Sequence, residues 1–312
     1  MKASELAGRL GYDIVGTDHE ITGISYAAEA GVRDLAVIKN RTQIRQTQAN
    51  VLLTPPVITD TDKTLIMSYD EIEMAVVRAC SVLAEAGVLA DYGLPEVLER
   101  TEDRFYTGLR VKISHSAKIY PGVVIGNDVS IGDNCVIEPF TVIGSGTVLA
   151  DHVFIGSGSK IGAESFYHAY DEWEGFSHFT GCGRTWIGEG THIGSQSVVQ
   201  RGTISDTVIG SHCMIGNCID IGHDVKIGNH CKIVSQTGIA GNAILGNYVT
   251  VYGQAGISNN VVIGDYVTVK PKTIVSRSIE DGQVVFGYFG RNFNEELELA
   301  AKIRRFFERK ED

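Results

Sequence analysis

The chain has 312 residues and a mass of 33.8 kDa, which predicts about two domains because domains usually run ~100 to 200 residues. It carries 27 Lys and Arg against 38 Asp and Glu, a net charge of −11. Nucleic-acid binding needs a basic field, so this balance excludes a nucleic-acid partner. The sequence contains no apolar run near the ~18 residues of a membrane span and no secretion signal, so we expect a cytoplasmic protein without an integral membrane segment.

Residues 1–105 show no long-range period and predict a small α/β domain. Ser4 is placed to cap a short helix that runs through Leu10. Residues 70–86 have helical spacing, with Asp70 at the N-cap. Three apolar segments suit strands: residues 35–38, 51–54 and 64–67.

An aliphatic residue recurs every six positions from Ile113 onward. Neither a helix of period 3.6 nor a strand of period 2 generates this rule, whereas a solenoid of short strands with turns at fixed intervals does. We therefore expect a parallel β-helix over residues 109–280. The sites are Ile113, Ile119, Ile125, Ile131, Ile137, Ile143, Leu149, Ile155, Ile161, Ile187, Ile193, Val199, Ile209, Ile215, Ile221, Ile227, Ile233, Ile239, Leu245, Val251, Ile257, Ile263, Val269 and Val275.

The period breaks twice, at residues 163–186 and 200–208. Both insertions are expected to leave the β-helix as external loops. The insertion at 163–186 is rich in aromatic residues. Such a loop either packs against a neighbouring subunit or lines a ligand site, and the sequence leaves both open. Residues 281–312 form a tail with a helix over 294–308, whose five nearby cations belong to a solvated face or to a dock for an acidic partner.

Three motifs in the repeat carry a family resemblance. They are RGTISDTVIG at 201–210, IGHDVKIGNHC at 221–231 after Asn217, and QTGIAGN at 236–242 followed by GQAGIS at 253–258. In this order they resemble the LpxD family, the UDP-3-O-(3-hydroxyacyl)glucosamine N-acyltransferases. The hexads are similar to those of the hexapeptide-repeat acyltransferases. That resemblance implies a left-handed β-helix in which three hexads close one triangular coil of 18 residues.

The resemblance makes His223 the catalytic general base and gives Gly241 the place whose backbone N–H faces the developing oxyanion. The spacing agrees, because residues 18 apart should lie one above the other. Histidine has a near-neutral pKa that suits removal of an amine proton. Asp220 or Asp224 could orient the imidazole, and the sequence does not choose between them.

The same motifs imply a set of substrate-binding residues in addition to the catalytic pair. Asn260 stands where the family carries a second histidine, and Asn40 matches an asparagine of the family's first domain. The uracil-stacking aromatics of the family fall near Val37 and Gln43, so uridine stacking is not expected. The candidates for substrate binding are Asn40, Asn217, Gln236, Gln254 and Asn260.

The resemblance implies an N-acyltransferase that moves an acyl group from a phosphopantetheine thioester of acyl carrier protein to the amine of a UDP-linked amino sugar, in a lipid A type pathway. One alternative uses acetyl- or another short acyl-CoA on another nucleotide amino sugar, and a second is a noncatalytic β-helix that binds a sugar nucleotide. A homotrimer is expected. We expect no tightly bound cofactor and no metal, because the chain lacks the full histidine motif of the related γ-class carbonic anhydrases.

Overall fold

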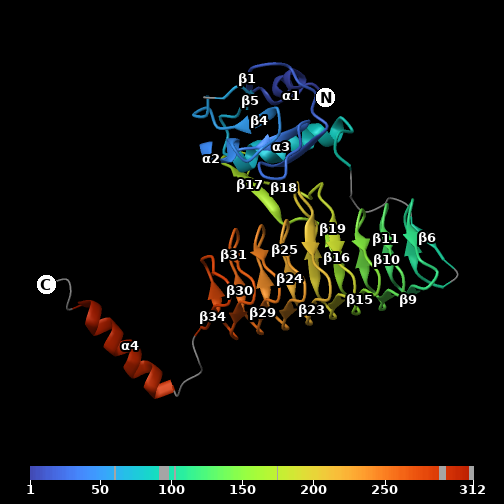
Figure 1. Ribbon diagram of the computed structural model, residues 1–312, viewed down its shortest axis with the longest axis vertical. Helices are drawn as coiled ribbons and strands as arrows, with labels where there is room; N and C mark the ends of the chain where they lie inside the picture. The colour runs from blue at the N-terminus through green and yellow to red at the C-terminus, as the bar shows by residue number, and fades with distance from the viewer. Residues whose placement is uncertain (60, 91–97, 102, 174, 288–292, 309–312) are drawn as a thin grey trace.

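The computed structural model describes residues 1–59, 61–90, 98–101, 103–173, 175–287 and 293–308 (Figure 1). It contains a small α/β head domain, a long parallel β-helix and a C-terminal helix. The head domain lies over the middle of the β-helix, and a β-hairpin that rises from the β-helix lies between them (Figure 1).

The head domain is built on a five-stranded sheet of order β1-β5-β4-β3-β2, in which only the β1–β5 pair is antiparallel. Helices α1 and α3 pack on one face of the sheet through Leu6, Cys80 and Leu83. A second apolar cluster around Ile38, Leu52 and Ile58 covers the other face. The elements are α1 (Ala3–Leu10), β1 (Asp13–Val15), β2 (Gly23–Tyr26), β3 (Asp34–Val37), α2 (Arg41–Ile44), β4 (Val51–Thr54), β5 (Thr64–Met67) and α3 (Ile72–Glu85).

Both predicted helix caps in the head domain were wrong. Helix α1 already begins at Ala3, and the distant Asp18 carboxylate accepts hydrogen bonds from the Ser4 backbone N–H and hydroxyl, each at 2.9 Å. Glu71 precedes α3. The Asp70 carboxylate instead accepts from the Arg78 guanidinium at 2.9 Å and from the Tyr12 hydroxyl. Long-range partners thus replaced the local capping bonds that the sequence suggested.

The β-helix consists of three sheets, one on each side of the prism, which contain 10, 8 and 9 strands among the described residues and are parallel except for the β6–β7 pair. The first contains β6 (Glu99–Arg100), β7 (Tyr106–Thr107), β10 (Val124–Ile125), β13 (Val142–Ile143), β16 (Lys160–Ala163), β21 (Val198–Gln200), β24 (Asp220–Ile221), β27 (Gly238–Ile239), β30 (Gly256–Ile257) and β33 (Ile274–Val275). The second contains β8 (Lys112–Ile113), β11 (Ser130–Ile131), β14 (Val148–Leu149), β19 (Thr185–Ile187), β22 (Thr207–Ile209), β25 (Lys226–Ile227), β28 (Ile244–Leu245) and β31 (Val262–Ile263). The third contains β9 (Lys118–Ile119), β12 (Val136–Ile137), β15 (Phe154–Ile155), β20 (His192–Ile193), β23 (Met214–Ile215), β26 (Lys232–Ile233), β29 (Thr250–Val251), β32 (Thr268–Val269) and β34 (Val284–Val285).

Every residue of the predicted six-residue ladder lies in one of these strands, and nearly all are buried in one continuous core. Where no insertion intervenes, the register is 18 residues: Ile221 pairs with Ile239, and Ile239 with Ile257. The predicted limits of 109–280 were too narrow. Strand β7 pairs with β10 before the ladder starts, and β34 pairs with β32 after it ends.

The two insertions enter the head-domain interface and are not free external loops. The first forms an antiparallel hairpin of β17 (Tyr167–Asp171) and β18 (Gly175–Phe179), whose Tyr167 and Phe179 pack against the α3 residues Met74 and Val77. The second is buried almost throughout, and its Ile204 joins the head-domain core. The aromatic insertion therefore packs against a domain of its own chain and not, in this chain alone, against a neighbouring subunit.

The C-terminal helix α4 (Phe293–Glu308) lies beyond the last coil of the β-helix in Figure 1. It matches the helix predicted for 294–308 to within one residue. Two of the five cations noted near it, Arg309 and Lys310, lie outside the described residues. Among the described residues, no helix is both long enough and apolar enough to cross a membrane.

Two isoleucines of the first sheet provide a test of the ladder. Ile143 points into the core and is fully buried, whereas Ile274 points outward and is 79% exposed. Ile143→Ala should lower the free energy of unfolding by about 2–5 kcal/mol, because it leaves a cavity in a packed core. Ile274→Ala should change it by no more than about 0.5 kcal/mol. Denaturant titration monitored by circular dichroism measures both, and equal effects would contradict the inward ladder.

Candidate active site

The His223 side chain lies at the corner that follows β24 and is only 14% exposed. Its Nδ1 lies 2.7 Å from Asp224 Oδ2. An ionised carboxylate can only accept a hydrogen bond, so this contact assigns the hydrogen to Nδ1 and leaves a lone pair on Nε2. The structure thereby resolves the choice left open by the sequence: Asp224, and not Asp220, is the partner of the imidazole.

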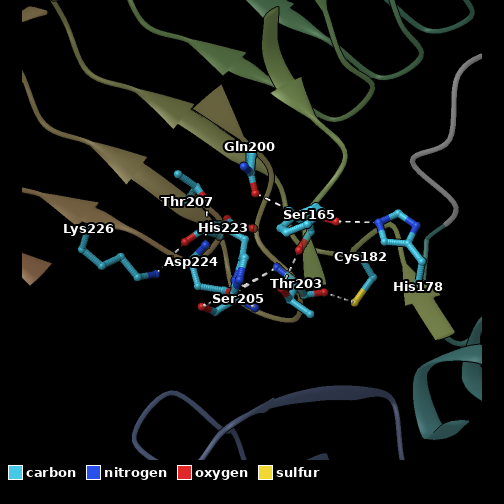
Figure 2. A network of polar contacts seen from close by, with 12 residues as sticks. Ser165, His178, Cys182, Gln200, Thr203, Ser205, Thr207, His223, Asp224 and Lys226 are labelled. Carbon is cyan, nitrogen blue, oxygen red and sulfur yellow. Dashed lines mark hydrogen bonds and ion pairs between the residues drawn. The ribbon is translucent and has the colours of Figure 1, made fainter. Parts of the chain in front are cut away.

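The Asp224 carboxylate is fixed by the second insertion (Figure 2). Its Oδ1 accepts from the backbone N–H of Thr203 at 3.0 Å and from the N–H and hydroxyl of Ser205, each at 3.1 Å. The Asp224 backbone N–H donates to Thr207 Oγ1 at 2.8 Å. These bonds satisfy a carboxylate whose side chain is only 1% exposed. The RGTISD segment therefore holds the aspartate that orients His223.

Gly241 lies one coil above His223, as the 18-residue spacing predicts. A Cβ atom at Gly241 would lie 2.5 Å from both Cε1 and Nε2 of the imidazole, so only glycine leaves room for the ring. Among the described residues, no acceptor is bonded to the Gly241 N–H. At an equivalent corner, by contrast, the Leu109 N–H donates to Asn127 Oδ1 at 2.7 Å. A free donor thus lies close to the free imidazole nitrogen.

A cavity of about 480 Å³ surrounds this pair on the side of the head domain. The β-helix, the hairpin and the head domain all contribute to its wall, so the docked head domain completes the site. The head-domain residues in the wall are Tyr26, Glu29, Lys39, Gln43 and Glu73. The remaining residues are Phe166, Tyr167, His168, Ser205, His223, Asp224, Lys226, Gly241, Asn242, Ile244, Asn259 and Asn260.

Two lysines of the cavity are each close to a glutamate of the head domain. Lys39 Nζ lies 2.8 Å from Glu73 Oε1 within the head domain. Lys226 Nζ, on the β-helix, lies 3.5 Å from Glu29 Oε1 and donates to the Asp206 carbonyl at 2.8 Å. The Lys226 contacts therefore link β25, the second insertion and the head domain at the edge of the cavity.

Two tyrosine hydroxyls stay protonated near the imidazole. Burial, together with the nearby negative charge of Asp224, raises the pKa of Tyr26 well above its usual value. Burial likewise raises the pKa of Tyr167, whose ring meets that of His223 edge-on with 5.6 Å between centroids. Both can offer a hydroxyl hydrogen at any physiological pH.

A second groove, with a volume of about 320 Å³, opens beside His223 over the outward face of the first sheet. His223, Gly241 and Phe166 line both hollows. The imidazole therefore lies where two molecules approaching from different sides could meet. This arrangement suits a transfer reaction between two substrates.

The predicted substrate-binding residues are only partly brought together. Asn260 lines the cavity with His223. Asn40 caps α2, accepting from the Thr42 N–H at 3.2 Å, and does not line the cavity. Asn217 lies in a hollow on another part of the prism, beside β23 and β26. Gln254 donates to Gln236 at 2.8 Å in an exposed pair outside both hollows. Their roles in substrate binding stay predictions.

Sequence reasoning missed four contributors: Tyr26, Tyr167, Thr203 and Ser205. The last two lie inside the RGTISDTVIG motif, so the motif itself pointed to them. Tyr167 belongs to the aromatic insertion. Tyr26 had no signal, because only the docking of the head domain brings it to His223.

Four aromatic side chains, spaced 18 residues apart, form an exposed stacked ladder on the β-helix. Ring centroids lie 5.3 Å apart for His212 and His230, 4.9 Å for His230 and Tyr248, and 4.9 Å for Tyr248 and Tyr266. Within the described part of the chain, no group of three or more His, Cys, Asp or Glu residues is placed to hold a metal ion.

Comparisons with known proteins agree with this fold. The bacterial transferase hexapeptide model (six repeats) matches residues 128–163 and 206–241. The solved structure of an Arabidopsis UDP-N-acetylglucosamine acyltransferase superposes with a TM-score of 0.52 at 21% identity, covering 58% of this chain and 64% of that one. These matches show hexapeptide repeats within residues 128–241, and the fold is a left-handed parallel β-helix.

Two sequence relatives share the name of one enzyme and so point to a particular activity. The chain is 28% identical over 224 residues to UDP-3-O-acylglucosamine N-acyltransferase 1 of Francisella tularensis subsp. holarctica, covering 66% of this chain and 64% of the relative. It is 34% identical over 113 residues to UDP-3-O-acylglucosamine N-acyltransferase of Anaeromyxobacter dehalogenans, covering 35% of this chain and 32% of the relative. These matches confirm the resemblance to the LpxD family.

The contact between His223 and Asp224 can be tested without an activity measurement. Nitrogen-15 NMR of the histidine rings should show His223 protonated at Nδ1 and unprotonated at Nε2 when the ring is neutral. In Asp224→Asn the amide can also donate, so the tautomer should shift toward a mixture. A wild-type His223 that carries its hydrogen on Nε2 would contradict the assignment.

Proposed function

We propose that the protein is an N-acyltransferase that moves an acyl group from a phosphopantetheine thioester to the amine of a nucleotide-linked amino sugar. The observation that carries the proposal is an imidazole oriented by a buried aspartate, with a free backbone donor one coil above, between two hollows. The name of the relatives supports a UDP-linked acylglucosamine as acceptor. The resemblance to the LpxD family supports a place in a lipid A type pathway.

In this reaction the acceptor amine lies in the larger cavity and attacks the thioester carbonyl. Nε2 of His223 takes a proton from the nitrogen as the C–N bond forms. The Asp224 carboxylate, 2.7 Å from Nδ1, holds the ring in the required tautomer and stabilises the imidazolium that results. Collapse of the tetrahedral intermediate breaks the C–S bond, and the imidazolium returns the proton to the thiolate.

The Gly241 N–H is the donor for the oxyanion in this scheme. It has no bonded acceptor among the described residues and lies beside His223, so it would need no rearrangement to receive the developing charge. Such preorganised donors contribute about 10²- to 10³-fold in rate. The Tyr26 hydroxyl and Asn260 lie in the same cavity and are available to the sugar.

The donor in this proposal is an acyl carrier protein, or a CoA thioester with the same pantetheine arm. We also propose a cytoplasmic homotrimer, in which the hollow containing Asn217 and the exposed Gln236–Gln254 pair would contact a neighbouring copy. Closed three-fold symmetry suits a prism with three flat faces. This placement would give those three residues a role in substrate binding across subunits.

His223→Ala should lower kcat by about 10²- to 10⁴-fold, the usual contribution of a general base. The assay follows thiol release from acyl carrier and acyl-CoA thioesters with several UDP- and dTDP-amino sugars. Exposed His230→Ala serves as the control and should retain full activity. Unchanged turnover in His223→Ala would rule out the mechanism, and sugar-nucleotide binding without any thiol release would favour a noncatalytic binding module.

Asp224→Asn should lower kcat by at least about 10²-fold and change KM little, because the amide allows the wrong tautomer without altering the shape of the site. Asp128→Asn is a matched control, since both aspartates occupy left-handed corners, with φ of 57° and 60°. Steady-state kinetics decide the matter. A loss confined to KM would mean that Asp224 binds substrate and does not orient His223.

A further inference from the structure

The second groove beside His223 has a floor of very small residues. Gly222, Gly238 and Ala240 lie along it. A Cβ atom at Gly238 would meet nothing within 4 Å, and the same is true of Gly256 one coil above. In the outward column of this sheet, two glycines therefore separate Asp220 from the exposed Ile274. The missing side chains hollow out the sheet face.

One end of this groove is polar. Asp220 and Gln200 line it together with Phe166 and His223. In the part of the chain that the structure describes, the Asp220 carboxylate accepts one long hydrogen bond, 3.5 Å from Gln200 Nε2. Among the described residues no cation forms an ion pair with it. Partial burial raises the pKa of this carboxyl, and Asp220 is the one Asp, Glu, Lys or Arg residue among the described residues that line the groove.

We propose that Asp220 is a specificity-determining residue that restricts the donor to short acyl groups. The inference rests on the proposed function and adds the chemical class of the donor. The larger cavity receives charged and hydrogen-bonding groups from the head domain and suits the sugar nucleotide. The acyl group then extends from His223 into the second groove, where a chain long enough to fill it must cover Asp220.

Covering an ionised carboxylate with hydrocarbon removes its water and returns no hydrogen bond, which strongly disfavours binding. In an apolar groove, by contrast, each added CH₂ strengthens binding by about 0.8 kcal/mol, or about fourfold. The two cases predict opposite trends with chain length. A carboxylate at this point should make activity fall where an apolar groove would make it rise.

The test measures kcat/KM for acetyl, butyryl, hexanoyl and octanoyl pantetheine thioesters with one acceptor. Wild-type activity should fall at least about tenfold from butyryl to octanoyl, and Asp220→Asn should reduce that ratio at least about tenfold by removing the charge at constant shape. Gly238→Val should impair hexanoyl and octanoyl transfer more than acetyl transfer, because it fills the groove. Glu189→Gln, at an exposed corner of another sheet, should leave the profile unchanged.

Several outcomes would overturn the inference. Activity that rises with chain length in the wild type would show that Asp220 excludes nothing. An equal loss for all donors in Asp220→Asn would place the residue on the pantetheine arm or in the fold, and a changed mass in solution would place it at a subunit contact. Absence of thiol release with every donor would instead refute the proposed function. Circular dichroism verifies that each variant is folded.

Discussion

The arrangement of the site depends on one buried carboxylate. Asp224 receives hydrogen bonds from Thr203 and Ser205 on one side and from the His223 ring on the other. A carboxylate that has lost its water must be satisfied by protein donors, and here the second insertion supplies them. The same insertion buries Ile204 in the head-domain core. The orientation of the imidazole and the docking of the head domain are therefore physically connected.

The β-helix contributes a fixed vertical register. Its strands pair at intervals of 18 residues, so residues far apart in sequence are aligned by the backbone ladder itself. Gly241 reaches His223 in this way, and its lack of a side chain leaves space for the ring. The site thus combines a rigid element, which places the donor above the base, with an irregular segment, which fixes the tautomer.

The β-helix could be predicted because each group of six residues places one aliphatic side chain in the core. A single period therefore placed every strand of the ladder, and its spacing paired His223 with Gly241. Three of the five head-domain strands were also located, since apolar runs such as 51–54 and 64–67 mark buried positions, whereas β1 and β2 were not predicted. Short-range patterns determined all of these features.

The remaining features depend on contacts between distant segments. Ser4 and Asp70 have good capping chemistry, but Asp18 and Arg78 provide stronger partners that the local sequence does not reveal. The choice between Asp220 and Asp224 required the left-handed turn that aims the second carboxylate at Nδ1. Tyr26 entered the site only through domain docking.

The 18-residue register also determines where the chain can gain or lose residues. Adding or losing one residue inside a coil would rotate every later side chain and exchange inward for outward positions. The hairpin at 163–186 and the segment at 200–208 avoid this outcome, because they leave and rejoin the ladder at corners. Insertions and deletions in the polypeptide can thus accumulate beside the corner that carries His223 while the His223–Gly241 alignment is inherited intact.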